Sequence, residues 1–139
     1  MLKGFSPILS PELLKILMEM GHGDELCIGD GNFPAASIAQ RLVRLDGHGV
    51  TEILDAILAL FPLDTYVDAP VTLMQVVPNV DPVIWKDYEK VIRKHESDKK
   101  IENIGRFEFY DRAKKCYAVV ATGESALYAN IILKKGVVK

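Results

Sequence analysis

The chain has 139 residues, of which 17 are Lys or Arg and 19 are Asp or Glu, so its formal net charge is −2. This length suits one globular domain with a single core. The balanced, scattered charges argue against partners such as nucleic acid or a membrane surface. The first residues lack the long apolar stretch of a secretory signal, so we expect a cytoplasmic protein.

Helical and strand patterns alternate from the start of the chain. A helix is predicted at about residues 11–20, because Ser10 is a good N-cap, apolar residues recur at helical spacing and Gly21 permits a left-handed stop. Residues 25–28 form a short apolar run between glycines, which favours a buried strand. Residues 35–45 are ambiguous, since their first half suits one or two helical turns and their second half suits a strand.

The rest of the chain continues the alternation. The strongest helical pattern covers residues 51–61. Asp81 and Pro82 predict the N-cap and first turn of a helix that runs to about Ile92. Further elements are expected as strands at 70–77, 101–104, 117–121 and 130–133 and as a helix at 106–115, with one linker-like stretch at 96–100. This order predicts an α/β fold, a three-layer sandwich with a mostly parallel sheet between helices.

Two residues in the first third suit acid/base or binding chemistry. His22 lies between two glycines at the exit of the first predicted helix, and histidine can give and take a proton near neutral pH. The same position also suits a histidine that bonds the last carbonyls of the helix. Asp30 follows a buried strand, where open α/β sheets place ligand-contacting residues, although aspartate is also a common turn residue.

Several other chemistries lack their sequence patterns. The glycines beside Asp30 have no third glycine at dinucleotide-binding spacing, and no nucleophile elbow is present. A metal site from His22, Asp24 and Asp30 would lack a second nearby histidine. Cys27 and Cys116 lie in apolar runs, so we expect buried free thiols rather than a disulfide.

The last third of the chain places polar and aromatic residues between apolar runs. Arg106, Tyr110, Tyr128 and Asn130 offer a fixed fork of donors, hydroxyl groups and an amide beside aromatic faces. Such a set suits the lining of a polyol site. Taken one at a time, each residue also suits an ordinary place at a strand end or on the surface.

Separated motifs then identify a family when they are taken together. They are Glu19-Met20-Gly21-His22-Gly23-Asp24-Glu25, Phe33-Pro34-Ala35, Arg106-Phe107-x-Phe109-Tyr110, Thr122-Gly123-Glu124 and Tyr128-x-Asn130-Ile131-x-Leu133. With these motifs in order, the chain resembles the ribose pyranase and fucose mutarotase family from end to end. The resemblance implies one sugar mutarotase domain over residues 1–139, which interconverts the α and β anomers of a free monosaccharide and needs no cofactor or metal.

The resemblance also implies roles for particular residues. His22 corresponds to the catalytic proton donor, and Tyr110 resembles a second acid/base group. The positions that correspond to sugar binding are Asp30, Arg106, Tyr128, Ala129 and Asn130. Ribose pyranases tend to carry a histidine where this chain has Arg106, so the resemblance favours the fucose mutarotase branch and L-fucose as the sugar. Its relatives form homo-oligomeric rings of eight or ten subunits, with the site where subunits meet.

Three alternative functions are also compatible with the sequence. One is pyranose/furanose interconversion of the ribose pyranase type. Another is a non-catalytic module that binds a monosaccharide, against which His22 argues because a binder needs no group that titrates near pH 7. A third is a structural subunit without a ligand, whose melting temperature no sugar would shift.

Overall fold

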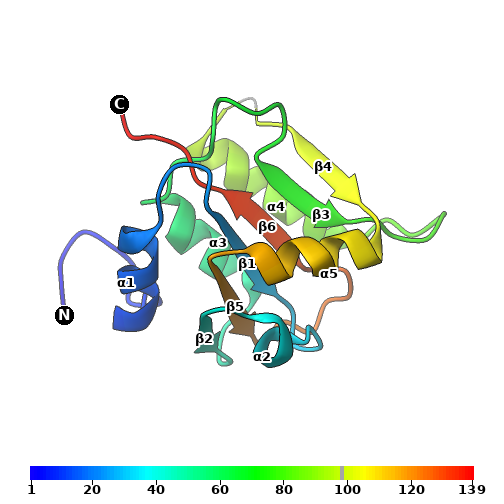
Figure 1. Cartoon of the computed structure of the whole chain (residues 1–139), viewed down its shortest axis with the longest axis horizontal. Helices are drawn as coiled ribbons and strands as arrows, with labels where there is room; N and C mark the ends of the chain where they lie inside the picture. Colours follow the sequence, from blue (N-terminus) through cyan, green and yellow to red (C-terminus); the bar gives the residue numbers. More distant parts are fainter. Residues whose placement is uncertain (98) are drawn as a thin grey trace.

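The computed structural model describes residues 1–97 and 99–139, which form one six-stranded sheet with helices on both faces (Figure 1). In chain order the elements are α1 (Pro11–Glu19), β1 (Glu25–Gly29), α2 (Ala35–Ile38), β2 (Leu42–Leu45), α3 (Val50–Leu58), β3 (Val71–Met74), α4 (Val83–His95), β4 (Ile101–Ile104), α5 (Arg106–Lys115), β5 (Ala118–Thr122) and β6 (Ile131–Lys134). The α/β fold predicted from the alternation is confirmed.

The strand order in the sheet is β2-β5-β1-β6-β3-β4. The pairs β2–β5, β5–β1 and β3–β4 are parallel, whereas β6 runs antiparallel to both β1 and β3. The sheet is therefore mostly parallel, as expected. Because β6 runs the other way, its first residue lies beside the carboxyl ends of its two neighbours, with Ile131 opposite Ile28.

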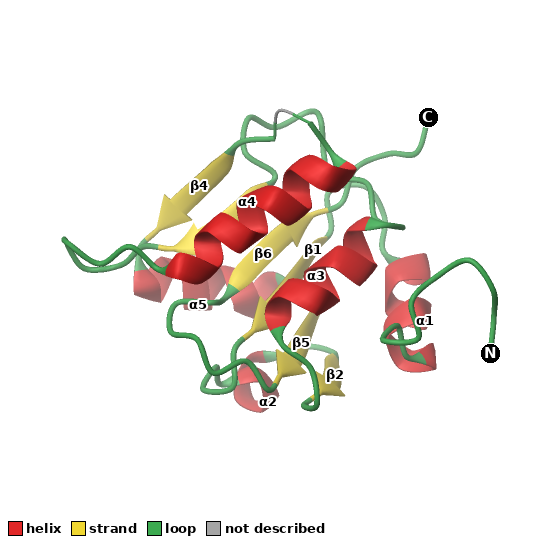
Figure 2. Ribbon diagram, turned by 180° about the vertical axis from the view of Figure 1, so that it is seen from behind, coloured by secondary structure: helices red, strands yellow, loops and turns green. Residues whose placement is uncertain are grey.

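The helices form a layer on each face of the sheet. Helices α3 and α4 cover one face (Figure 2), and α2 and α5 cover the other. Side chains along β1 alternate between the two resulting cores, with Leu26 and Ile28 packed on the α3 and α4 side and Cys27 on the α2 and α5 side. Cys27 and Cys116 are buried and free, which confirms the sequence prediction.

The predicted helix boundaries are wrong at two capping residues. The Ser10 side chain caps α1 as expected, but the helix ends at Glu19, its C-cap residue Met20 is extended, and the left-handed residue is Gly23, with a φ of 86°. Helix α4 has Pro82 rather than Asp81 as its N-cap residue, with no side-chain cap. The Asp81 carboxylate instead lies 3.9 Å from Nζ of Lys86.

Strand β3 is shorter than the predicted 70–77, because its partner β4 ends at Ile104 and only the Gln75 amide finds one more acceptor there, at 2.7 Å. Helix α3 likewise stops at Leu58 rather than at residue 61. Both halves of the ambiguous stretch 35–45 are realised, as α2 and β2.

The linker-like stretch predicted at 96–100 includes residue 98, which lies outside the described residues. Within the described part of the chain, no helix has both the length and the apolar composition that crossing a membrane requires.

Candidate active site

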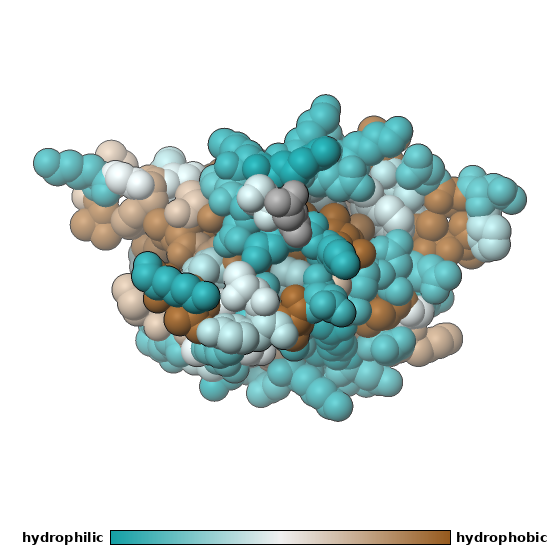
Figure 3. All heavy atoms as spheres, turned by 90° about the horizontal axis from the view of Figure 1, so that it is seen from above, coloured by the Kyte–Doolittle hydropathy of each residue, from teal (hydrophilic) through white to brown (hydrophobic). Residues whose placement is uncertain are grey.

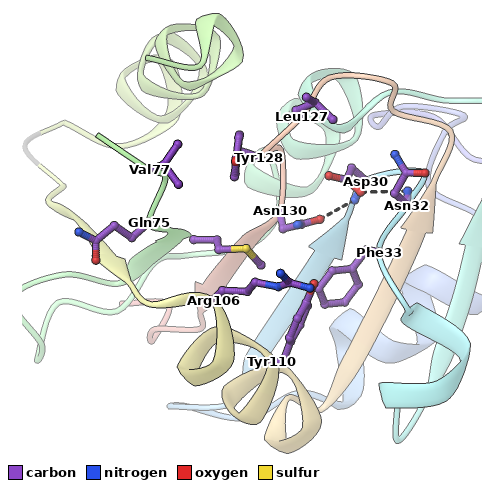
Figure 4. A pocket seen from close by; sticks show the side chains of 11 residues that line it. Asp30, Asn32, Phe33, Gln75, Val77, Arg106, Tyr110, Leu127, Tyr128 and Asn130 are labelled. Atoms are coloured by element: carbon purple, nitrogen blue, oxygen red, sulfur yellow. Dashed lines mark hydrogen bonds between the residues drawn. The ribbon is translucent and has the colours of Figure 1, made fainter. Parts of the chain in front are cut away.

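A cavity of about 360 Å³ opens where β1 and β3 end and β6 begins (Figure 4). Its lining residues are Asp30, Asn32, Phe33, Met74, Gln75, Val77, Arg106, Tyr110, Leu127, Tyr128 and Asn130. The volume falls in the range of small-molecule sites, roughly 300–1,000 Å³. The structure therefore brings together five of the predicted site residues from three separate parts of the sequence.

Asp30 and Asn130 form the innermost polar pair of the cavity. The Asp30 amide donates to Oδ1 of Asn130 at 2.8 Å, and the Asn32 amide donates to Oδ1 of Asp30 at 3.0 Å. Both side chains belong to nearly buried residues, 8% and 6% exposed. Because Oδ1 of Asn130 is occupied, its Nδ2 group is left to donate hydrogen bonds to a ligand.

Burial also changes the acidity of Asp30. It raises the pKa of the carboxyl above its ordinary value, although the backbone amides of Asn32 and Ala129 oppose the shift. A carboxylate with a raised pKa is a better proton acceptor than an exposed aspartate. Asp30 is thus suited to accept a hydrogen bond from a sugar hydroxyl.

The first two turns of α5 supply the opposite wall. Arg106 and Tyr110 are four residues apart on one helix face, and the Arg106 guanidinium carbon lies 5.7 Å from the centre of the Tyr110 ring. The Tyr110 ring in turn lies 5.7 Å from the Phe33 ring. This wall combines a fork of charged donors and a phenol hydroxyl with apolar ring surface.

Helix α4 holds the segment before β6 in an unusual conformation. Tyr128 has a φ of 58°, in the left-handed region that a tyrosine rarely adopts. The Trp85 indole donates to the Tyr128 carbonyl at 2.8 Å, and the Tyr88 hydroxyl donates to the carbonyl of Ala129. Burial raises the pKa of Tyr88, which keeps this hydroxyl protonated. Ala129, predicted as a sugar-binding position, is buried and does not line the cavity.

His22 does not lie at this cavity. It precedes β1, whereas Asp30 follows that strand, and the five residues of β1 span roughly 13 Å. In Figure 1 this strand runs from the upper end of the sheet to the lower end. Within one chain, His22 therefore cannot reach a ligand that Asp30 and Asn130 hold.

At its own end of the sheet, His22 pairs with an aspartate. Its Nε2 lies 3.0 Å from Oδ1 of Asp64, whose side chain is only 4% exposed, while the His22 side chain is 45% exposed. The Tyr66 ring lies 5.2 Å from the His22 ring. Among the hydrogen bonds of the described residues, the His22 ring bonds Asp64 rather than the last carbonyls of α1, so the helix-capping interpretation is wrong.

Backbone contacts fix the position of His22. The positive φ of Gly23 makes the tight turn, and the Gly23 amide donates to the Lys135 carbonyl at 2.8 Å. The Gly21 amide donates to Oδ2 of Asp24 at 2.7 Å. Figure 3 views the molecule from this end, where hydrophilic side chains cover most of the middle of the face and apolar ones gather toward its sides.

The alternative metal site from His22, Asp24 and Asp30 is not assembled, because Asp30 lies at the far end of β1. In the part of the chain that the structure describes, no three His, Cys, Asp or Glu side chains are placed to hold a metal ion.

Several site residues carried no sequence signal. Met74, Gln75 and Val77 reach the cavity because β3 lies beside β6 in the sheet. Local sequence patterns do not predict this strand order. Asp64 sits in an irregular loop, and Trp85 looks like an ordinary helix residue. Phe33 was part of a family motif, which was the one available signal.

Comparison with known proteins shows the family of this chain. Residues 3–138 match the model of the RbsD / FucU transport protein family. The chain belongs to this family. Among the curated relatives of this RbsD / FucU protein, the L-fucose mutarotase of Actinobacillus pleuropneumoniae serotype 5b (strain L20) is 55% identical over 140 residues, covering 99% of this chain and 97% of the relative. The fucose mutarotase of Homo sapiens is 50% identical over 144 residues, covering 98% and 94%.

A solved structure is similar over nearly all of this chain. The fucose mutarotase of Streptococcus pneumoniae, in complex with L-fucose, superposes with a TM-score of 0.95 and is 54% identical, covering 99% of this chain and 100% of that chain. These relatives confirm the family, and its fucose mutarotase branch, that the separated motifs identified.

Proposed function

We propose that this protein is an L-fucose mutarotase, an enzyme that interconverts the α and β anomers of the free sugar. The observation that carries the proposal is the similarity, at 54% identity and a TM-score of 0.95, to a fucose mutarotase in complex with L-fucose. The cavity suits such a ligand. Asp30, Asn130 and Arg106 offer partners for hydroxyl groups, while Phe33 and Met74 offer apolar surface for the methyl group of a 6-deoxy sugar.

The reaction needs two proton transfers and no cofactor. An acid gives a proton to the ring oxygen while a base takes one from the anomeric hydroxyl, and the bond between C1 and the ring oxygen breaks. The open aldehyde rotates about its C1–C2 bond, and the same groups act in reverse as the ring closes on the other face. A positioned acid/base group typically contributes about 10² to 10⁴ in rate.

The proposed roles follow the family resemblance. His22 is the proton donor and Tyr110 the second acid/base group. Asp30, Arg106, Tyr128 and Asn130 hold the sugar hydroxyls, and Ala129 contributes indirectly, through a backbone amide that bonds the Asp30 carboxyl. Two observations support the binding roles: these four residues line one cavity, and Asp30 and Asn130 fix each other.

A second copy of the chain must then supply His22. When each subunit presents its His22 end to the next subunit and its cavity to the previous one, the interface is head-to-tail, and such an interface forms a ring when the rotation between neighbours closes. Exposed apolar side chains at both ends support this contact, with Tyr66 69% exposed beside His22, and Leu127 67% and Val77 57% exposed at the cavity. We propose a ring of eight or ten subunits, with a free monosaccharide as the ligand.

Arg106 favours L-fucose over ribose pyranase activity, because a histidine is the expected residue of that branch. A binding module without catalysis is the other alternative. The solvent-exposed imidazole on a buried carboxylate favours catalysis, since binding alone does not require it.

Saturation-transfer NMR on free L-fucose, D-ribose and D-glucose tests the proposal. We expect the protein to accelerate the exchange of L-fucose anomers most. Equal acceleration of all three sugars would remove the substrate assignment. A sugar-dependent thermal shift without faster exchange would identify a binding module instead.

A further inference from the structure

We propose that Asp64 is a positioning residue for the reaction, which holds His22 so that Nδ1, and not Nε2, exchanges the proton with the sugar. The inference rests on the proposed function, because it names the nitrogen through which His22 would act.

The geometry divides the two ring nitrogens between two tasks. Nε2 of His22 lies 3.0 Å from Oδ1 of Asp64, inside the molecule, and 45% of the His22 side chain is exposed. The nitrogen that faces Asp64 is taken up by the protein. Nδ1 is the nitrogen left for a ligand that a neighbouring subunit brings to this surface.

The charge of Asp64 fixes the tautomer. Burial pushes the pKa of Asp64 upward, but the Tyr66 amide and the His22 ring outweigh it and hold the pKa below its ordinary value. The carboxylate is thus ionised at neutral pH and can only accept hydrogen bonds. Nε2 must therefore carry a hydrogen, which leaves Nδ1 as a base in the neutral ring and as an acid in the imidazolium.

Asp64 itself is held from two sides. Its amide donates to the Lys134 carbonyl at 3.0 Å, and its Oδ1 also accepts from the Tyr66 amide at 3.1 Å. The Leu63 amide just before it donates to Oε1 of Glu96 at 2.8 Å. A carboxylate fixed in this way can orient a ring, because its own rotamer is already determined.

Both members of the pair are anchored on the same stretch of chain after β6. Leu63 pairs with Lys135 in an antiparallel bridge, and Lys135 also accepts the hydrogen bond from Gly23. A Cβ at Gly136 would lie 2.5 Å from the Leu63 carbonyl oxygen, so glycine permits this close approach. The relative position of His22 and Asp64 is thus set by one short segment of backbone.

The decisive measurement is the tautomer of His22 in the active wild-type protein. In ¹⁵N NMR spectra recorded well above neutral pH, we expect a protonated Nε2 and an unprotonated Nδ1. A wild type that exchanges L-fucose anomers with the hydrogen on Nδ1 would overturn the positioning role of Asp64 while leaving the proposed function intact. A wild type with the expected tautomer that accelerates no sugar would overturn the proposed function instead.

A variant measures the size of the effect. Asp64→Asn should lower kcat for L-fucose exchange roughly 10-fold to 100-fold with KM little changed, which is less than the 10² to 10⁴ that a positioned acid/base group supplies, because His22 itself remains. It should also give a mixed His22 tautomer. Asp68→Asn removes the same charge from an exposed site four residues on and should leave the rate unchanged. A folded Asp64→Asn protein with normal kcat would overturn the proposal, and if this variant fails to fold, the wild-type tautomer decides it.

Discussion

The two ends of the sheet each hold a nearly buried aspartate, and the pKa values of the two carboxyl groups are shifted in opposite directions. Asp30, 8% exposed, lines the cavity with a raised pKa, because burial outweighs the backbone amides that bond it. Asp64, 3% exposed, lies beside His22 with a lowered pKa, because its partners outweigh burial. At the cavity end, burial dominates although backbone amides bond the Asp30 carboxyl. At the other end, the Tyr66 amide and the His22 imidazole together hold the Asp64 carboxylate in its ionised form.

The largest effect that separates the two ends is expected for His22→Ala. It should lower the rate of L-fucose anomer exchange by about 10² or more, as the loss of one acid/base group predicts. The affinity for L-fucose should change little, because Asp30, Arg106 and Asn130 remain. NMR exchange measurements, titration with L-fucose and thermal melting on the same sample would test this. A folded variant with near-normal exchange would contradict the catalytic role.

Mixed assemblies test whether the two ends act across subunits. His22→Ala and Arg106→Ala should each be inactive alone, yet their ring subunits, dissociated and reassembled together, should recover about a quarter of wild-type activity if pairing is random and head-to-tail. Sites built within one chain would recover nothing. A preparation that is monomeric and fully active would also contradict the shared site.

A smaller effect is expected from the support of Tyr128. Trp85→Phe removes the donor to a carbonyl in a left-handed segment, a loss of about 1 kcal/mol, so KM should rise roughly fivefold with kcat less affected. Lys90→Ala, on the exposed side of the same helix, is the matched control. An unchanged KM for Trp85→Phe would show that the cavity holds its shape without this hydrogen bond.

The smallest effect is a difference in the pH dependence of stability. The lowered pKa of Asp64 stabilises the fold above its unfolded value near 3.8, and this contribution is lost as the pH falls through the folded pKa. The raised pKa of Asp30 has the opposite sign, so its ionisation costs stability as the pH rises above about 3.8.

Melting temperatures across acidic pH can resolve these signs. The melting temperature of wild type should exceed that of Asp64→Asn by a growing margin as the pH rises toward about 3.8. The melting temperature of wild type relative to that of Asp30→Asn should fall as the pH rises above about 3.8. Two gaps that change in the same direction would contradict the contrast between the two ends.

Local patterns in the sequence predict most of the fold. A short apolar run between glycines placed β1, the bounds predicted for β4 and α5 match the structure, and Ser10 marked the start of α1 correctly. The prediction that Asp81 caps α4 was wrong, because Pro82 takes the N-cap position and the helix begins there without a side-chain hydrogen bond.

The sequence predicts the cavity residues better than their arrangement. Asp30 and Asn130 are 100 residues apart, and only the antiparallel course of β6 sets them side by side. The separation of His22 from the cavity depends equally on strand direction. Asp64 was missed because only the folded chain brings it into contact with His22, and no local sequence pattern shows that contact.

Strand β6 connects the two ends directly. Asn130 precedes it at the cavity, and Lys134 and Lys135 at its far end accept the hydrogen bonds that locate Asp64 and Gly23. Ladders to β1 and β3 on both sides make this four-residue strand a rigid spacer. A slip of its register by one residue would turn every side chain to the opposite face. Such a slip would displace Asn130 at the cavity and the backbone that locates His22 and Asp64 at the same time, so the length of β6 sets the distance between the two ends of the molecule.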